Sequence, residues 1–199
     1  MWNLGRNLVV AALGLVVLSA FVAPAAAEVG PGHAMITVSG SYALGKLEAN
    51  QELVEGAALN MALDVFTRTK PISFLVVLSW AQMTRQDAES DGLFERRVHA
   101  SPLLFGAKFW LGPRRFKLNA GAALGIWFGS LRTTLDGQEV ARVADEGFGL
   151  SVPVGLSISI TRGTNINAGY TLHVFEDNSF LTDNILHSVN VGFGFSWSG

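Results

Sequence analysis

The chain has 199 residues, of which 49% are hydrophobic and 15% are charged, so it is long enough for one domain with a core and more apolar than a typical soluble domain. It contains no cysteine, which excludes disulfides, thiolate metal sites and cysteine nucleophiles. Its formal net charge of −2 provides no basic field for nucleic acid, so no nucleic-acid partner is expected.

The first 27 residues match the pattern of a secretory signal peptide. Arg6 supplies an early positive charge, an apolar run follows it, and Pro24 precedes three alanines that end at Ala27. Cleavage after Ala27 predicts one mature domain over residues 28–199. The alternative is an uncleaved membrane anchor, which the proline and the alanines disfavour. No later segment is apolar for about 18 consecutive residues, so no transmembrane helix is expected after this one.

In the rest of the chain, large apolar side chains alternate with small or polar ones. Successive side chains of a strand point to opposite faces, so this alternation predicts strands with one bulky apolar face and one small or polar face. The pattern predicts eight strands in chain order, near residues 33–44, 57–68, 72–83, 98–111, 116–130, 148–160, 165–175 and 185–199.

The connections between these strands are expected to alternate in length. Tight turns are predicted at 69–71, 112–115 and 162–164, and long loops at 45–56, 84–97, 132–147 and 176–184. Short and long connections then lie at opposite ends of an up-and-down sheet. Almost every acidic residue falls in the long loops: Glu48, Glu52, Glu55, Asp87, Glu89, Asp91, Glu95, Asp136, Glu139, Asp145, Glu146, Glu176, Asp177 and Asp183.

The two faces of the strands indicate the compartment. The apolar faces continue over about a dozen residues, which is enough for a tilted strand to cross a bilayer. The opposite faces are rich in Gly, Ala, Ser and Asn and nearly uncharged, unlike the surface of a soluble protein. Small residues suit a narrow lumen and bulky ones suit lipid. The predicted fold class is therefore all-β, an eight-stranded antiparallel up-and-down transmembrane β-barrel.

This combination of features resembles the small outer-membrane barrels of the OmpA/OmpX type, over essentially all of residues 28–199. The last strand also resembles the C-terminal signal read by the outer-membrane assembly machinery, at Asn190, Gly192, Phe195 and Trp197, although Ser198 and Gly199 follow the final aromatic residue. The resemblance implies a bacterial outer-membrane location after export through the periplasm. It also implies that the tight turns face the periplasm and the long loops face the outside.

The predicted lumen contains large side chains and a few charges. An eight-stranded barrel has an interior that side chains just fill, and the candidates that plug it are Phe66, Trp110, Trp127 and Phe175. Asp64 and Lys108 are expected at similar height and form a candidate ion pair across the lumen, with Lys117 nearby. The many lumenal glycines leave space for water, so a narrow channel for ions or small solutes is the alternative function.

A third possibility is an enzyme that modifies lipid A, because some outer-membrane deacylases use a His-x-Ser pair on a lipid-facing strand. His99 and Ser101 are two residues apart and share the predicted outer face, where a histidine base could activate a serine. No acidic residue is clearly placed to orient His99, so no catalytic residue is expected. His173 is expected at the lumenal rim before Glu176 and Asp177, without the spacing of a metal site, so neither a metal nor a cofactor is expected.

The outer surface predicts the partners. Aromatic side chains near strand ends on the outer face are expected to form interfacial girdles, namely Trp80, Phe109, Phe116, Tyr170 and Trp197. The acidic loops form a solvated rim or bind divalent cations beside lipopolysaccharide head groups or an external partner. We expect a monomer that contacts outer-membrane lipid, lipopolysaccharide and, during biogenesis, the assembly machinery. Its expected role is structural or one of surface interaction.

Overall fold

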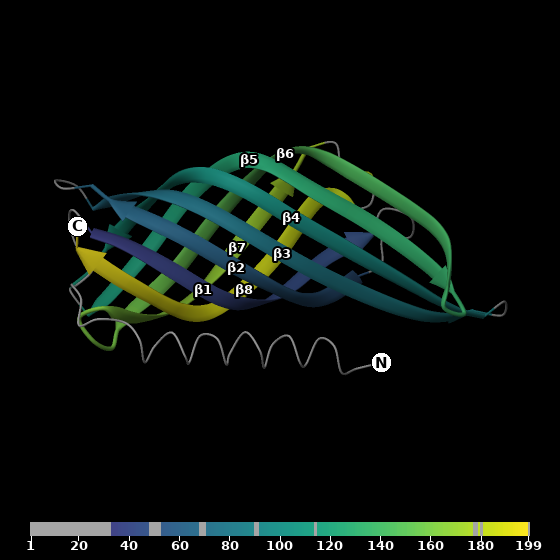
Figure 1. Ribbon diagram of the computed structural model, residues 1–199, viewed down its shortest axis with the longest axis horizontal. Coiled ribbons are helices and arrows are strands. Elements are labelled where there is room, and N and C mark those ends of the chain that lie inside the picture. The colour runs from purple at the N-terminus through teal and green to yellow at the C-terminus, as the bar shows by residue number, and fades with distance from the viewer. Residues whose placement is uncertain are drawn as a thin grey trace.

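The computed structural model describes residues 33–47, 53–67, 71–89, 92–113, 115–176, 179 and 181–198. Eight antiparallel strands form one closed barrel in which each strand pairs with its neighbours in sequence and β1 pairs with β8 (Figure 1). They are β1 (His33–Leu47), β2 (Leu53–Phe66), β3 (Ile72–Glu89), β4 (Gly92–Leu111), β5 (Phe116–Leu135), β6 (Gln138–Ser159), β7 (Thr164–Phe175) and β8 (Leu181–Ser198). This confirms the predicted fold class. The predicted signal peptide lies outside the described residues.

The alternation read from the sequence matches the two faces of the barrel wall. Phe74 and Phe148, on the face assigned to lipid, are 65% and 69% exposed, whereas the neighbouring Leu75 is buried. On β5 the outward apolar series runs from Phe116 to Phe128. This span is roughly 40 Å along the strand at about 3.3 Å per residue, or roughly 30 Å in height at a tilt of about 40°. An apolar belt of this height matches the hydrocarbon core of a bilayer. Within the described residues, no helix is long and apolar enough to span a membrane.

The two ends of the barrel differ. β2–β3, β4–β5 and β6–β7 are connected at one end of the barrel, where β1 also begins and β8 ends. We call this the short-turn end. At the other end, the hairpin end, β3 to β6 continue past the remaining strands (Figure 1). β6 has no β7 partner before Gly149, and β3 has no β2 partner after Thr84. We call this four-stranded projection, made of residues 84–89, 92–97, 130–135 and 138–147, the blade.

The blade corrects the prediction of long loops at 84–97 and 132–147. β3 and β4 pair as far as Glu89 opposite Gly92, and β5 and β6 are joined by two residues only. These are Asp136 and Gly137, whose φ angles of 50° and 84° are those of a tight hairpin turn that favours the Asp-Gly sequence. The prediction failed because a strand with both faces exposed to solvent does not alternate between apolar and polar residues, so its sequence does not indicate a strand.

The interior is divided into layers. The hairpin half holds an apolar cluster that includes Leu47, Met83, Val98, Trp127 and Phe175. A smaller cluster near the short-turn end consists of Met35, Phe66 and Trp110. Between these clusters, polar side chains share the lumen with a third apolar cluster on β3, β4 and β5, made of Leu75, Leu104 and Ala123.

Candidate functional site

Two aromatic pairs occupy the lumen at different heights. Trp127 of β5 packs on Phe175 of β7 in the hairpin half, with ring centroids 4.8 Å apart and both side chains almost fully buried. Phe66 of β2 packs on Trp110 of β4 nearer the short-turn end, with ring centroids 5.2 Å apart. All four aromatic residues singled out in the sequence therefore point inward. They form two separate contacts because the stagger of the strands places them at two levels.

The candidate ion pair forms beside the second aromatic pair. Lys108 Nζ lies 3.0 Å from Asp64 Oδ2, and the Asp64 side chain has no exposed area. Ser73 donates a hydrogen bond to Asp64 Oδ1 at 2.7 Å, and the indole N–H of Trp110 donates to Ser73 at 2.9 Å. Because Asp64 and Lys108 lie on β2 and β4, the pair follows the wall past β3 and does not cross the lumen. Lys117 also faces inward, but it lies opposite Ser157, nearer the short-turn end.

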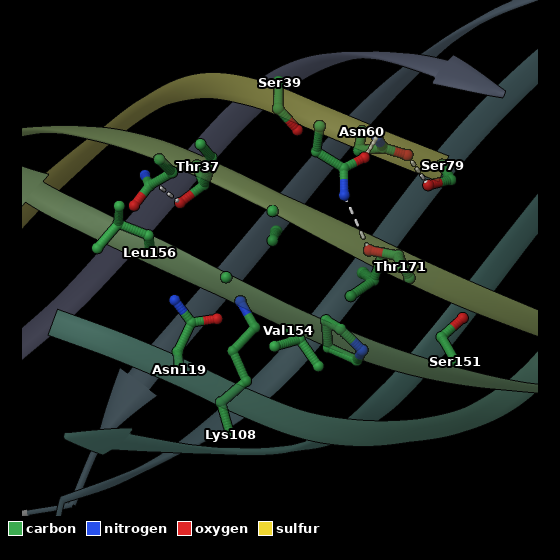
Figure 2. Close-up of a pocket in the computed structure, with 18 of the residues that line it drawn as sticks. Thr37, Ser39, Asn60, Ser79, Lys108, Asn119, Ser151, Val154, Leu156 and Thr171 are labelled. Carbon is green, nitrogen blue, oxygen red and sulfur yellow. Dashed lines mark hydrogen bonds between the residues drawn. The ribbon is translucent and has the colours of Figure 1, made fainter. Parts of the chain in front are cut away.

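A cavity of about 100 Å³, lined by both polar and apolar side chains, lies between the two aromatic levels (Figure 2). Lys108 and Asn119 reach it from β4 and β5, and its other polar lining residues include Thr37, Ser39, Asn60, Ser79 and Thr171. Asn190 joins three strands here, since it accepts a hydrogen bond from Asn60 at 3.0 Å and donates one to Thr171 at 2.9 Å. Polar groups of this layer therefore satisfy one another across the lumen, as buried polar groups must.

His173 closes the polar layer at its hairpin side. Its Nδ1 lies 2.5 Å from the Ser151 hydroxyl, and its ring stacks on Phe175 with centroids 6.1 Å apart. It is a lumenal histidine, as predicted, but it is buried beneath the aromatic pair and does not lie at the rim. In the part of the chain that the structure describes, no three His, Asp or Glu side chains gather into a group that could hold a metal ion. Asp177 lies outside that part.

The outer face carries the expected aromatic residues and the His-x-Ser pair. Each of the five girdle candidates points outward and is more than a third exposed: Trp80, Phe109, Phe116, Tyr170 and Trp197. His99 also points outward and packs near Trp80, with ring centroids 6.0 Å apart. Ser101 lies opposite Phe128. Among the described residues, no hydrogen bond joins His99 to Ser101 or to a carboxylate, so the geometry of an activated serine is not assembled.

The C-terminal strand closes the barrel against β1. Asn190 and Gly192 face the lumen, whereas Phe195 and Trp197 face outward and pair with Ile36 and Ala34. The four residues of the expected assembly signal are therefore split between the two faces of β8. Their recognition by the assembly machinery stays a prediction.

Comparison with known proteins places this barrel in a family. The family model described as "Outer membrane protein beta-barrel domain" matches residues 13–198. The chain belongs to this family. It is an integral protein of the bacterial outer membrane, as predicted.

Solved structures of outer-membrane barrels share the fold. Ail, the attachment invasion locus protein of Yersinia pestis, is 19% identical, with 84% of this chain and 99% of that one covered and a TM-score of 0.56. Neisserial surface protein A is 17% identical, with coverage of 82% and 98% and a TM-score of 0.56. OprG from Pseudomonas aeruginosa is 12% identical, with coverage of 87% and 99% and a TM-score of 0.57. None of the curated proteins is similar enough in sequence to count as a relative.

On the inner side of the blade of this outer-membrane barrel, acidic side chains are paired with arginines. Asp87 accepts hydrogen bonds from Arg85 at 2.8 Å and from Arg96 at 3.0 Å. Arg85 also donates to the Leu53 carbonyl at 3.1 Å, which ties β3 to the start of β2. The blade is thus held to the barrel by charge-assisted hydrogen bonds.

Acidic side chains on the outer side and at the edge of the blade also have polar partners. Glu95 lies 2.5 Å from Arg97, and Glu139 lies 2.6 Å from Arg132. Asp145 accepts two hydrogen bonds from Ser179, and these hold the pKa of the Asp145 carboxyl below its ordinary value.

The prediction that this end of the barrel carries acidic loops therefore needs correction. The described part of the hairpin end carries both signs of charge, and much of the acid is already paired. Other acidic residues of the predicted loops lie outside the described residues, namely Glu48, Glu52, Asp91 and Asp177. Sequence reasoning missed the five blade arginines, Arg85, Arg96, Arg97, Arg132 and Arg142. The Asp-Gly pair at 136–137 is a signal for a tight hairpin turn, so it could have placed Arg132 and Arg142 on two paired strands instead of in a loop.

Proposed function

We propose that this outer-membrane barrel serves as a membrane anchor that presents the blade outside the cell for surface interaction. The observation that carries the proposal is that β3 to β6 extend beyond the lipid-facing belt, and the buried apolar cluster around Trp127 and Phe175 in the lumen beneath them supports it. A barrel whose interior is occupied and whose strands project is suited to holding a surface in place. Neisserial surface protein A is named as a surface protein and Ail is named for attachment and invasion, which agrees with this role.

The proposal requires the hairpin end to face outward and the short-turn end to face the periplasm. Small outer-membrane barrels have short periplasmic turns and longer extracellular connections, which supports this orientation. We further propose that the protein acts as a monomer, since closure of the barrel leaves β1 and β8 paired with each other. Surrounding lipid and lipopolysaccharide are its proposed contacts.

Single introduced cysteines test the orientation. The chain has no cysteine of its own, so no native thiol of this protein reacts with the label. Val140→Cys places a thiol on the exposed blade, and Arg162→Cys places one on the exposed turn at the opposite end. On intact cells, a membrane-impermeant maleimide should label Val140→Cys only. Arg162→Cys should react after the outer membrane is permeabilised. The reverse pattern, or no labelling of Val140→Cys on intact cells, would overturn the proposal.

A narrow channel is the second candidate function, and the cavity beside Lys108, which is lined in part by polar side chains, favours it. Conduction requires both aromatic levels to move, since Trp127 and Phe66 with their partners lie on either side of that cavity. Planar-bilayer recording of the refolded protein separates the two functions. The anchor predicts a silent bilayer, and regular unitary currents from the wild-type protein would favour the channel.

A further inference from the structure

Three arginines form an outward-facing row across the blade. Arg97 of β4 pairs directly with Arg132 of β5, and Arg132 pairs directly with Arg142 of β6. Arg132 lies on the same face of β5 as the lipid-facing Phe128, which places the row on the outer surface. Residues directly opposite in antiparallel strands have Cβ atoms about 5 Å apart. The three guanidinium groups are thus attached within one short lateral row.

The charge of this row is only partly balanced. Like charges directly opposite on neighbouring strands destabilise a sheet. Glu95 and Glu139 each pair with one arginine, so two carboxylates face three guanidinium groups. Among the described residues, Arg142 makes no ion pair, and the buried Nε–H of Arg97 has no hydrogen-bond acceptor. The row therefore has an excess positive charge, which an external anion can balance.

The surface below the row changes in steps from apolar to charged. Ile126 and its cross-strand partners Leu103 and Phe148 belong to the lipid-facing belt. Phe128 is the next outward residue of β5, Ser130 follows it, and Arg132 comes after that. The row is about 13 Å along the strand beyond Phe128, or about 10 Å in height at a tilt of about 40°. This is the depth of lipid head groups next to the hydrocarbon.

We propose that Arg97, Arg132 and Arg142 bind a phosphate group on the sugar head group of an outer-leaflet glycolipid, as found on lipopolysaccharide. The guanidinium fork matches a phosphate with two parallel hydrogen bonds, and a dianionic phosphate neutralises the repulsion within the row. The inference rests on the proposed function, because the row faces the outer leaflet only if the hairpin end is outside the cell. The site also gives the blade a fixed position against the membrane surface.

Thermal unfolding in lipid vesicles tests the site. Wild-type protein is refolded into phosphatidylethanolamine vesicles with phosphorylated lipid A, with enzymatically dephosphorylated lipid A, or with no lipid A. We expect only phosphorylated lipid A to raise the unfolding midpoint. The double variant Arg97→Gln/Arg142→Gln should lose this shift, with an apparent affinity at least about tenfold weaker. Its midpoint without lipid A should be unchanged or higher, because the repulsion is relieved. Arg162→Gln, at the short-turn end, is the matched control and should keep the full shift.

Each outcome of this experiment decides the proposal. Equal shifts for wild type and the double variant, or equal shifts with dephosphorylated lipid A, would overturn it. A shift produced by inorganic phosphate alone at similar concentration would show a site for free anions and would overturn the lipid assignment. Vesicles hold lipid A in both leaflets, so the result does not depend on orientation. If phosphorylated lipid A gives no specific shift of the unfolding midpoint but Val140→Cys is labelled as expected, the phosphate site is rejected and the proposed function stands.

Discussion

Trp127 and Phe175 meet inside the barrel although they belong to β5 and β7, with ring centroids 4.8 Å apart. β6 lies between these strands in the wall, so the contact is made by side chains that reach through the interior. The Trp127 indole N–H also donates to the Glu176 carbonyl at 3.3 Å, where β7 ends. This contact fixes the large rings across the lumen and gives the hairpin half its apolar filling.

Removing one large ring from each level should open a path for ions. The change is Trp127→Ala combined with Trp110→Ala, and we expect small unitary currents in planar bilayers. Either single variant should stay silent, because the other aromatic pair remains. Each truncation of a buried tryptophan costs about 3–5 kcal/mol of stability, so heat modifiability must first show that the double variant folds. A folded but silent double variant would show that further side chains close the lumen.

The buried ion pair should show strong coupling between its partners. Lys108→Met leaves the Asp64 carboxylate buried without its cation and should lower the free energy of unfolding by about 3 kcal/mol or more. Asp64→Asn added to Lys108→Met removes the charge and keeps an acceptor for Ser73, so it should recover most of that loss. Urea unfolding in phospholipid vesicles, read from the gel shift of the folded form, measures both. Additive losses in the double variant would argue that the two side chains do not depend on each other.

The wall and the lumen could be predicted from the sequence because every predicted strand there has one face in lipid and one in a narrow interior. That difference in environment makes Asp64 and Lys108 exceptional on their strands, so their inward placement followed from residue chemistry alone. Their contact along the wall past Ser73 depends on the stagger between β2, β3 and β4. Single-strand periodicity contains no information on stagger.

The blade could not be predicted in the same way. Both of its faces are exposed to solvent, so the hydrophobic alternation in the sequence ends although the strands continue. The row of Arg97, Arg132 and Arg142 follows from pairing between strands, and that pairing is set by the turn at Asp136 and by an irregularity in the β5–β6 register next to Thr133. In the sequence, the same arginines are scattered among acidic residues and read as ordinary loop charges.

The Asp145 carboxyl should titrate below its ordinary range, because hydrogen bonds from Ser179 favour its charged form. A lowered pKa in the folded state stabilises the fold above the unfolded pKa of about 3.9, and this contribution is lost as the pH falls through the folded pKa. The link between β6 and Ser179 is therefore complete at neutral pH and is released only in acid. Carboxyl-carbon NMR titration in micelles should give a lower midpoint for Asp145 in wild type than in Ser179→Ala, with Asp145→Asn identifying the signal. An unchanged midpoint in Ser179→Ala would contradict the assigned cause.

The seam between β1 and β8 should depend on the absence of a side chain at residue 192. A Cβ added to Gly192 would lie 2.2 Å from the Val38 carbonyl oxygen and 2.4 Å from Ser39 Cβ, so Gly192→Ala must push the two strands apart. We expect a loss of about 2 kcal/mol and a lower refolding yield. Gly40→Ala on the same seam is the control, since no atom lies within 4 Å of its added Cβ, and it should fold like wild type.

Refolding of purified protein into vesicles takes place without assembly machinery, so a defect of Gly192→Ala there is structural. Trp197→Ala, on the outward face of β8, should refold normally in vesicles if its main role is recognition during biogenesis, and its yield should fall only in cells. Normal refolding of Gly192→Ala with a loss in cells alone would contradict the steric argument. It would assign Gly192, like Trp197, to the assembly signal.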